Sequence, residues 1–280
     1  MMSLDHTRLA DQLLAAVLQA GDVIMRHRQA GVAVQHKADK SPVTLADQEA
    51  EEIILAALAT YAPGVAVVAE EASSRGEKSA LSDTFFLVDP LDGTRDFVRG
   101  GTDFSVNIGL IAGSVPCFGM IYAPALDQLT MTLAADRAVE VTIAPDAKPA
   151  GLSSLTLKPM HTRTPDMTRL VAVGSRSHRS PKDEAFKADP RITDYCEIGS
   201  SLKFGLVACG KADIYPRFGP TSEWDTAAGH AILLAAGGDV TLLDGAPFLY
   251  GKRDASFLNP SFVAWGDRAL IPLFTPELGA

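Results

Sequence analysis

Apolar residues return every three or four positions between residues 5 and 29. This period predicts an amphipathic helix that packs one face on a core. A second helix is predicted to begin after Thr44, with Ala50 and Leu58 on its inner face. Thr44 and Asp47 have the spacing of a capping box, a purely structural role, and the alternative is that Asp47 faces a catalytic site.

The pattern then changes to one typical of β-strands. Short apolar runs at 65–69 and 85–88 predict buried strands, and a polar loop at 72–82 is expected to be mobile. Period-two alternation and turn residues continue beyond them, which indicates an antiparallel meander. The strands of this meander are expected at 104–110, 117–122, 128–133 and 138–143.

Residues 144–165 have no sustained period and are predicted to connect two halves of the chain. Beyond them, predicted strands alternate with helices, which favours an α/β layer and an overall α+β class. We expect an N-terminal α+β subdomain over 1–155 and a C-terminal α/β subdomain over 156–280. In the second half, strands are expected at 170–174, 193–198, 213–216 and near 240 and 262, and helices at 182–188, 201–209 and 225–236.

Composition narrows the classes of partner. The 280 residues carry a formal net charge of −9, which argues against a nucleic-acid binder that needs a broad basic face. A small phosphorylated substrate stays compatible with this charge if metal ions and local cations offset the repulsion. Cys117, Cys196 and Cys209 are far apart and lack metal-ligand spacing, so buried free thiols in a reducing compartment are expected.

The expected location is the cytoplasm. No apolar run approaches the roughly 20 residues of a membrane span. Asp5 and Asp11 lie within the N-terminal amphipathic pattern, which argues against a signal peptide. Weak peripheral association with the cytoplasmic face of the inner membrane stays an alternative, and the oligomeric state is left open.

Candidate chemistry gathers where the strand at 85–88 runs into Asp89-Pro90-Leu91-Asp92-Gly93. Pro90 is expected to stop ladder pairing, and Asp92-Gly93 allows a tight turn. The amides of Gly93 and the next residue can then converge on an anion. Carboxylates beside a phosphate repel it unless cations lie between them, so this stretch implies divalent metal ions, with hard oxygen ligands suiting Mg²⁺.

Each acidic position also has a structural interpretation. Asp-Gly after a strand is often only a turn, and a charged pair such as Glu70-Glu71 is usually a solvated loop. Asp225 is compatible with a simple N-cap, while Ala227 and Ala228 would let its helix approach a neighbour closely. Three separated acidic points in one chain favour a metal site over these separate structural roles.

Together, Glu70-Glu71, the run from Asp89 to Thr94, and Trp224-Asp225-Thr226-Ala227-Ala228-Gly229 resemble the metal-site motifs of the inositol monophosphatase superfamily. The segments 174–178, 199–204, 212–217 and 257–260 resemble its CysQ branch, the 3'(2'),5'-bisphosphate nucleotidases. The resemblance implies a layered α/β/α/β/α sandwich. It also implies Mg²⁺-dependent removal of the 3'-phosphate of 3'-phosphoadenosine 5'-phosphate (PAP) in sulfur assimilation, with its sulfated relative PAPS as a second substrate and with inhibition by lithium.

The same resemblance assigns site residues. The metal ligands, for two or three Mg²⁺ ions, would be Glu70, Asp89, the carbonyl of Leu91, Asp92 and Asp225. The catalytic residues would be Asp47, Thr94 and Glu70, with Asp47 and Thr94 aligning and deprotonating the attacking water. The residues that contact substrate would be Glu70, Leu91, Asp92, Gly93, Thr94, His178, Ser200, Lys203, Arg217 and Asp225.

Several of these assignments have alternatives. His178 is also compatible with a loop histidine, and Lys203 and Arg217 with isolated surface charges. Arg95 replaces the lysine associated with this position in the branch and keeps the charge. An inositol monophosphatase or a fructose-1,6-bisphosphatase is an alternative activity because relatives use the same metal site, and a nucleotide or phosphate sensor is the non-enzymatic alternative.

Overall fold

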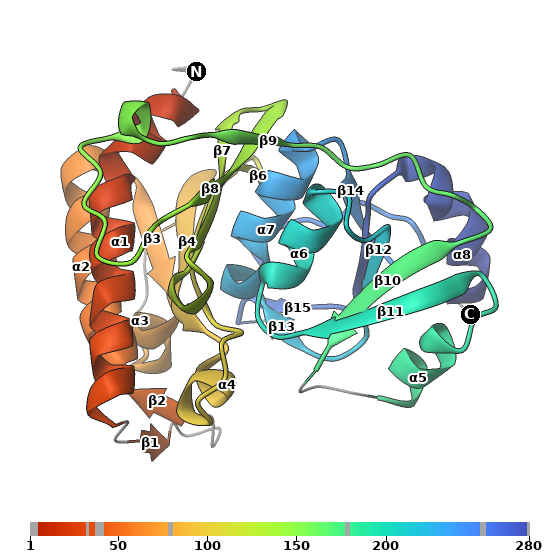
Figure 1. The fold of residues 1–280 in the computed structure, drawn as a ribbon, viewed down its shortest axis with the longest axis horizontal. Coiled ribbons are helices and arrows are strands. Elements are labelled where there is room, and N and C mark those ends of the chain that lie inside the picture. The colour runs from red at the N-terminus through yellow and green to blue at the C-terminus, as the bar shows by residue number, and fades with distance from the viewer. Residues whose placement is uncertain are drawn as a thin grey trace.

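The computed structural model describes residues 5–31, 34–36, 42–77, 81–176, 180–252 and 256–278. Over these residues the chain forms two large sheets and three layers of helices that alternate across the molecule (Figure 1). The helices are α1 (His6–Ala30), α2 (Leu45–Tyr61), α3 (Glu70–Ser74), α4 (Thr94–Val98), α5 (Pro181–Lys187), α6 (Leu202–Ala208), α7 (Glu223–Ala235) and α8 (Ile271–Leu278), with 3-10 turns at Pro124–Leu126, Leu152–Ser154 and Arg268–Leu270.

The strands form two large and two small sheets. The first sheet has seven strands, in the order β3 (Ala66–Ala69), β4 (Thr84–Asp92), β5 (Ser105–Ala112), β6 (Val115–Ala123), β7 (Gln128–Ala134), β8 (Arg137–Thr142) and β9 (Lys158–Met160). The second has five, in the order β11 (Ile192–Ile198), β10 (Leu170–Ser175), β12 (Ile214–Arg217), β16 (Phe262–Trp265) and β14 (Asp239–Leu242). The small sheets pair β1 (Val34–His36) with β2 (Pro42–Thr44), and β13 (Thr221–Ser222) with β15 (Leu258–Asn259).

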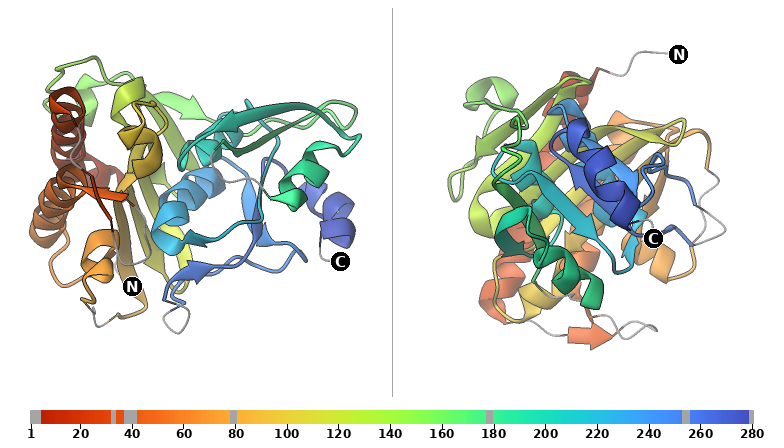
Figure 2. Two further views of the ribbon diagram at one scale, coloured as in Figure 1. Left: turned by 90° about the horizontal axis from the view of Figure 1, so that it is seen from below. Right: turned by 90° about the vertical axis from the view of Figure 1, so that its right-hand side faces the viewer.

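Three hydrophobic cores separate these layers. The first lies between α1, α2 and the outer face of the first sheet. The second fills the space around α6 and α7, between the two sheets. The third lies where α5 and α8 cover the far face of the second sheet, at the side opposite α1 and α2 in Figures 1 and 2. The predicted α+β class and α/β/α/β/α layering are confirmed.

Helix α7 is closely packed against β5 and β6. A Cβ at Gly109 would be 2.6 Å from the Cβ of Ala227, and a Cβ at Gly119 would be 2.1 Å from the carbonyl oxygen of Ala228. The close approach predicted from the small residues of this helix is therefore confirmed. Since neither the strands nor the helix can shift, the sheet fixes the position of α7 and of Asp225 in its first turn.

Strands β3 and β4 run parallel, while the other pairs of the first sheet are antiparallel. Ala69 pairs with Val88, so Glu70 and Asp89, which follow them, lie at the same end of these two strands, where Asp89 still pairs with Asn107 of β5. Pro90 interrupts the ladder between β4 and β5 but does not end it, because pairing resumes between Asp92 and Ser105. The expectation that pairing stops at Pro90 is corrected to this extent.

Two predictions of irregular structure were wrong. The loop predicted over 72–82 begins in part as helix, because residues 70–74 form the short helix α3, whose Glu71 N–H donates to the buried carboxylate of Glu51. The connecting stretch 144–165 contains β9, in which Pro159 pairs with Val139. A proline is tolerated there because β9 is the edge strand of the sheet and needs donors on one side only.

The predicted burial of all three cysteines was also wrong. Cys117 and Cys209 are free and partly buried, but Cys196 is exposed because it lies on β11, the outer strand of the second sheet. Within the described part of the chain, no helix combines the length and apolar character needed to cross a membrane. The division of the chain near residue 155 stays a prediction.

Candidate active site

A cavity of about 260 Å³ opens where β4, α3 and the first turn of α7 meet the loop between β11 and α6. Its wall brings together residues that are far apart in sequence and were predicted to form one site. These are Glu70, Asp89, Leu91, Asp92, Gly93, Thr94, Ser200, Lys203, Arg217 and Asp225. Asp47 lies behind this wall, and His178 lies outside the described residues.

The four carboxylates reach the cavity from three elements. Glu70 begins α3, Asp89 and Asp92 come from the end of β4, and Asp225 lies in the first turn of α7. Burial, followed by the charges of Glu70, Asp92 and Asp225, raises the pKa of Asp89 well above its ordinary value. Burial also raises the pKa of Asp225, with Asp92 and Glu70 as the next causes. Such a cluster is costly without cations.

A hard divalent cation fits these donors chemically, since carboxylates and a carbonyl are its preferred ligands. Among the residues that the structure describes, however, no three acidic, histidine or cysteine side chains are already gathered as a metal site. Asp92 Oδ2 accepts the Ser201 N–H at 2.6 Å, and Asp225 Oδ2 accepts the Ser222 N–H at 2.8 Å. A cation would therefore bind mainly through the remaining carboxylate oxygens.

Asp47 caps α2 and also contacts Thr94 in the wall of the cavity. Its Oδ2 accepts hydrogen bonds from the backbone N–H and the hydroxyl of Thr44, each at 2.7 Å, and so completes the cap of α2. Its Oδ1 accepts the hydroxyl of Thr94 at 3.2 Å. Asp47 is 1% exposed, and these three hydrogen bonds orient its carboxylate. The capping box and a contact to the site belong to the same side chain.

Gly93 turns the chain from β4 into α4. Its φ of 90° lies in the left-handed region, which favours glycine, and a Cβ would be 2.5 Å from the carbonyl oxygen of Asp103. The turn lets the Thr94 hydroxyl reach back to the carbonyl of Leu91 at 3.0 Å. Gly93 is thus required by both backbone geometry and packing.

A cluster of small polar side chains that no sequence pattern indicated joins the two halves at Asp92. The hydroxyl of Ser200 donates to Asp92 Oδ2 at 2.7 Å, and Ser105 Oγ lies 2.6 Å from Ser200 Oγ and 2.9 Å from Ser201 Oγ. The Ser201 hydroxyl donates to Asn107 Oδ1 at 2.8 Å. Ser105 and Asn107 occupied the polar face of a predicted strand, and they are fully buried because that face meets the second half.

A second contact holds the same loop from the other side. Asp103 Oδ2 accepts the Gly199 N–H at 2.7 Å and pairs with Arg176 Nη1, also at 2.7 Å. Ser200, between these anchors, has a φ of 53°, which is uncommon for a residue with a side chain. The loop from 199 to 201 is therefore held in one conformation by residues of the first half.

Lys203 and Arg217 are buried, so their interpretation as isolated surface charges was wrong. Lys203 is 4% exposed, and its Nζ donates to the carbonyls of Ile198, at 3.3 Å, and Ser200. Arg217 is 7% exposed and donates to the carbonyls of Gly219 and Pro220, at 3.2 and 2.9 Å. Burial lowers the pKa of Lys203 to about 8. Both cations shape the loops that line the cavity.

Comparison with known proteins agrees with this geometry. The inositol monophosphatase family matches residues 5–266 of the chain. The chain belongs to this family. It is 39% identical over 256 residues to the 3'(2'),5'-bisphosphate nucleotidase CysQ of Shigella flexneri, covering 91% of this chain and 98% of the relative.

Solved structures show the same fold. CysQ from Bacteroides thetaiotaomicron is 34% identical, with a TM-score of 0.75 over 94% of this chain and 98% of the other. An inositol monophosphatase from Zymomonas mobilis is 24% identical, with a TM-score of 0.74 over 99% of this chain and 98% of the other, which supports the fold alone. The predicted family and fold are confirmed.

Proposed function

We propose that this protein is a Mg²⁺-dependent 3'(2'),5'-bisphosphate nucleotidase that hydrolyses the 3'-phosphate of PAP to AMP and phosphate in sulfur assimilation, with PAPS as a second substrate. The observation that carries this proposal is the meeting of Glu70, Asp89, Asp92 and Asp225 in one cavity with the Asp47–Thr94 pair behind it. The similarity to relatives named CysQ supports the nucleotide substrate. The proposed reaction takes place in the cytoplasm.

In this proposal the ligands for two or three Mg²⁺ ions are the four carboxylates and the carbonyl of Leu91. Bound Mg²⁺ would supply charge stabilisation and lower the pKa of a water molecule. The amides of Gly93 and Thr94 hold the scissile phosphate. The Thr94 hydroxyl, which donates to Asp47, takes a proton from the attacking water as its own proton passes to the carboxylate.

Two cations are available for the second phosphate of the nucleotide. Lys203 and Arg217 both line the cavity, and in addition hold neighbouring backbone carbonyls. His178 remains a predicted contact outside the described residues. Inositol phosphates and fructose 1,6-bisphosphate contain phosphate groups but no nucleoside. They are therefore the alternative substrates with which PAP is compared.

The first experiment measures phosphate release from PAP, inositol 1-phosphate and fructose 1,6-bisphosphate, with Mg²⁺ and with a chelator. We expect Mg²⁺-dependent turnover with PAP preferred, and inhibition by lithium. Preference for a sugar or inositol phosphate would keep the metal chemistry and reject the nucleotide substrate. A sensor that binds PAP without releasing phosphate would reject the enzymatic proposal.

A variant pair tests the nucleotide contacts directly. Lys203→Met should raise KM for PAP by about tenfold, since an ionic hydrogen bond contributes roughly 1.5–3 kcal/mol, and should raise KM for inositol 1-phosphate less. Lys211→Met is the matched control because Lys211 is exposed and does not line the cavity. Equal effects of Lys203→Met on both substrates would count against nucleotide specificity.

A further inference from the structure

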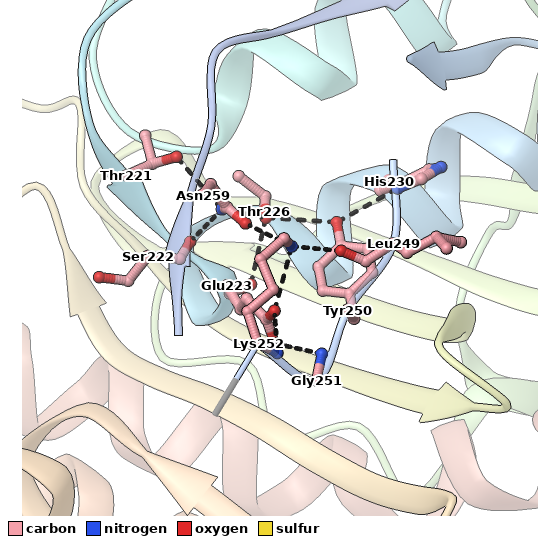
Figure 3. Close-up of polar contacts among 10 residues, drawn as sticks. All are labelled: Thr221, Ser222, Glu223, Thr226, His230, Leu249, Tyr250, Gly251, Lys252 and Asn259. Carbon is pink, nitrogen blue, oxygen red and sulfur yellow. Dashed lines mark hydrogen bonds and ion pairs between the residues drawn. The ribbon is translucent and has the colours of Figure 1, made fainter. Parts of the chain in front are cut away.

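A buried ion pair lies beside the first turn of α7 and is not used by the proposed reaction. Glu223, the first residue of this helix, is 0% exposed, and its Oε1 accepts Lys252 Nζ at 3.1 Å (Figure 3). The same carboxylate accepts the N–H groups of Gly251 and Lys252 at 2.8 and 2.9 Å. Glu223 therefore ties the chain near residue 251 to the start of α7.

Asn259 connects this ion pair to the cavity. Its Oδ1 accepts Lys252 Nζ at 3.2 Å, and its Nδ2 donates to the Ser222 carbonyl at 2.8 Å and the Thr226 hydroxyl at 3.1 Å (Figure 3). The Ser222 N–H donates in turn to Asp225 Oδ2 at 2.8 Å. An unbroken chain of polar contacts thus runs from Lys252 to the Asp225 carboxylate.

Burial makes this network sensitive to the loss of either charge. A carboxylate with no exposed surface cannot exchange its partner for water, so Glu223 needs the ammonium group of Lys252. Lys252 is itself held over the rings of Phe248 and Tyr250, at 4.8 and 5.2 Å from their centres. Removing the ammonium leaves Glu223 charged and underpartnered at the base of α7.

We infer that Glu223, Lys252 and Asn259 are positioning residues that fix the Asp225 carboxylate at the cavity. This inference rests on the proposed function, in which Asp225 is a metal ligand. Hydrogen-bond partners that orient a metal ligand typically contribute 10- to 100-fold in metal affinity. The network therefore sets the affinity of the site for Mg²⁺ without touching metal or substrate.

Lys252→Met tests the inference because it keeps the length of the stem and removes the charge. We expect the Mg²⁺ concentration for half-maximal turnover to rise by about tenfold while KM for the nucleotide changes less than threefold. In metal-free protein, NMR should show faster hydrogen exchange of the Ser222 amide, whose acceptor is Asp225. Lys252→Arg should restore both values. If Lys252→Met does not fold, Asn259→Ser cuts the link to Ser222 and leaves the ion pair.

A matched control separates positioning from stability. Asp213 is 1% exposed and pairs with Arg163 at 2.6 Å away from the cavity, so Asp213→Asn should lower stability and leave the Mg²⁺ requirement unchanged. Unchanged Ser222 exchange in Lys252→Met would overturn the inference. Wild-type protein without Mg²⁺-dependent turnover would overturn the proposed function instead, and the exchange measurement would still decide whether the network positions Asp225.

Discussion

The hydroxyl of Thr94 lies 3.2 Å from Oδ1 of Asp47, while Oδ2 of the same carboxylate caps α2 through Thr44. One side chain thus serves the helix with one oxygen and the cavity with the other. The cap fixes how the carboxylate lies and so presents its second oxygen to Thr94. A residue whose spacing indicates a helix cap therefore also contacts a hydroxyl of the cavity wall.

Asp47→Asn separates these two roles. The amide oxygen can still cap α2, but the amide nitrogen then faces Thr94 and cannot accept its proton. We expect kcat to fall by about 10²- to 10⁴-fold, with stability changed by no more than about 1 kcal/mol. Steady-state kinetics and urea unfolding measure the two effects.

The control for this variant is Asp183→Asn, because Ser180 and Asp183 form the same capping box at α5. It should show a similar change in stability and unchanged kcat. A kcat for Asp47→Asn within threefold of wild type would show that Asp47 acts only as a cap.

Asp92→Asn should abolish turnover with the fold intact, because it removes one anionic ligand and almost no volume. The amide oxygen can still accept from Ser200 and Ser201, which now donate to Asp92 Oδ2. Mg²⁺ should raise the Tm of the wild type and raise that of the variant less, since ligand binding stabilises only the folded state. Near-full activity of the variant would refute this metal assignment.

Gly119→Ala tests the packing of α7 on the sheet. Its Cβ would lie 2.1 Å from the Ala228 carbonyl oxygen, and a backbone atom cannot rotate away. We expect a loss of about 1–3 kcal/mol in the free energy of unfolding, measured in urea. Gly205→Ala in α6, where a Cβ meets nothing within 4 Å, should be neutral or stabilising by up to about 1 kcal/mol. Equal stabilities would contradict the close contact.

His230 predicts a loss of stability in acid. Burial lowers its pKa to about 3, and its Nδ1 lies 3.2 Å from the Tyr250 hydroxyl. In the unfolded chain His230 binds a proton near pH 6.5, whereas in the folded protein it stays neutral down to about pH 3. The free energy of unfolding therefore falls as the pH drops from 6.5 towards 3. His230→Gln cannot titrate at this position. We expect the free energy of unfolding of the wild type, relative to that of the variant, to fall by about 2 kcal/mol between pH 7 and pH 5. A difference independent of pH would contradict the prediction.

Local patterns predicted most elements because helical and strand periods reflect burial on one face, as in α1 and β5. They failed where partners come from elsewhere in the chain. Residues 72–74, predicted as loop, belong to a helix whose start is hydrogen-bonded to Glu51, and β9 pairs with the edge of β8. The local sequence of neither segment shows that it will contact Glu51 or β8.

The acidic residues of the site were predictable because their chemistry is unusual beside apolar strands. The residues that hold them were not. Asn107 lies on the polar face of a predicted strand, and Glu223 lies just before the helix predicted over 225–236, yet both are fully buried. Their roles depend on which surfaces of the two halves meet, and periodicity along one segment carries no information about that.

Because Ala69 pairs with Val88, enzymatic activity also depends on the correct register of β3 and β4. Glu70 follows the last residue of β3 directly, so a slip of β3 by one residue would reverse the faces of that strand and move Glu70 away from its place beside Asp89. Such a molecule would keep much of its secondary structure but would have no catalytic activity. The specific activity of refolded protein would therefore measure the fraction of chains in which β3 and β4 pair in register. Circular dichroism cannot measure this fraction.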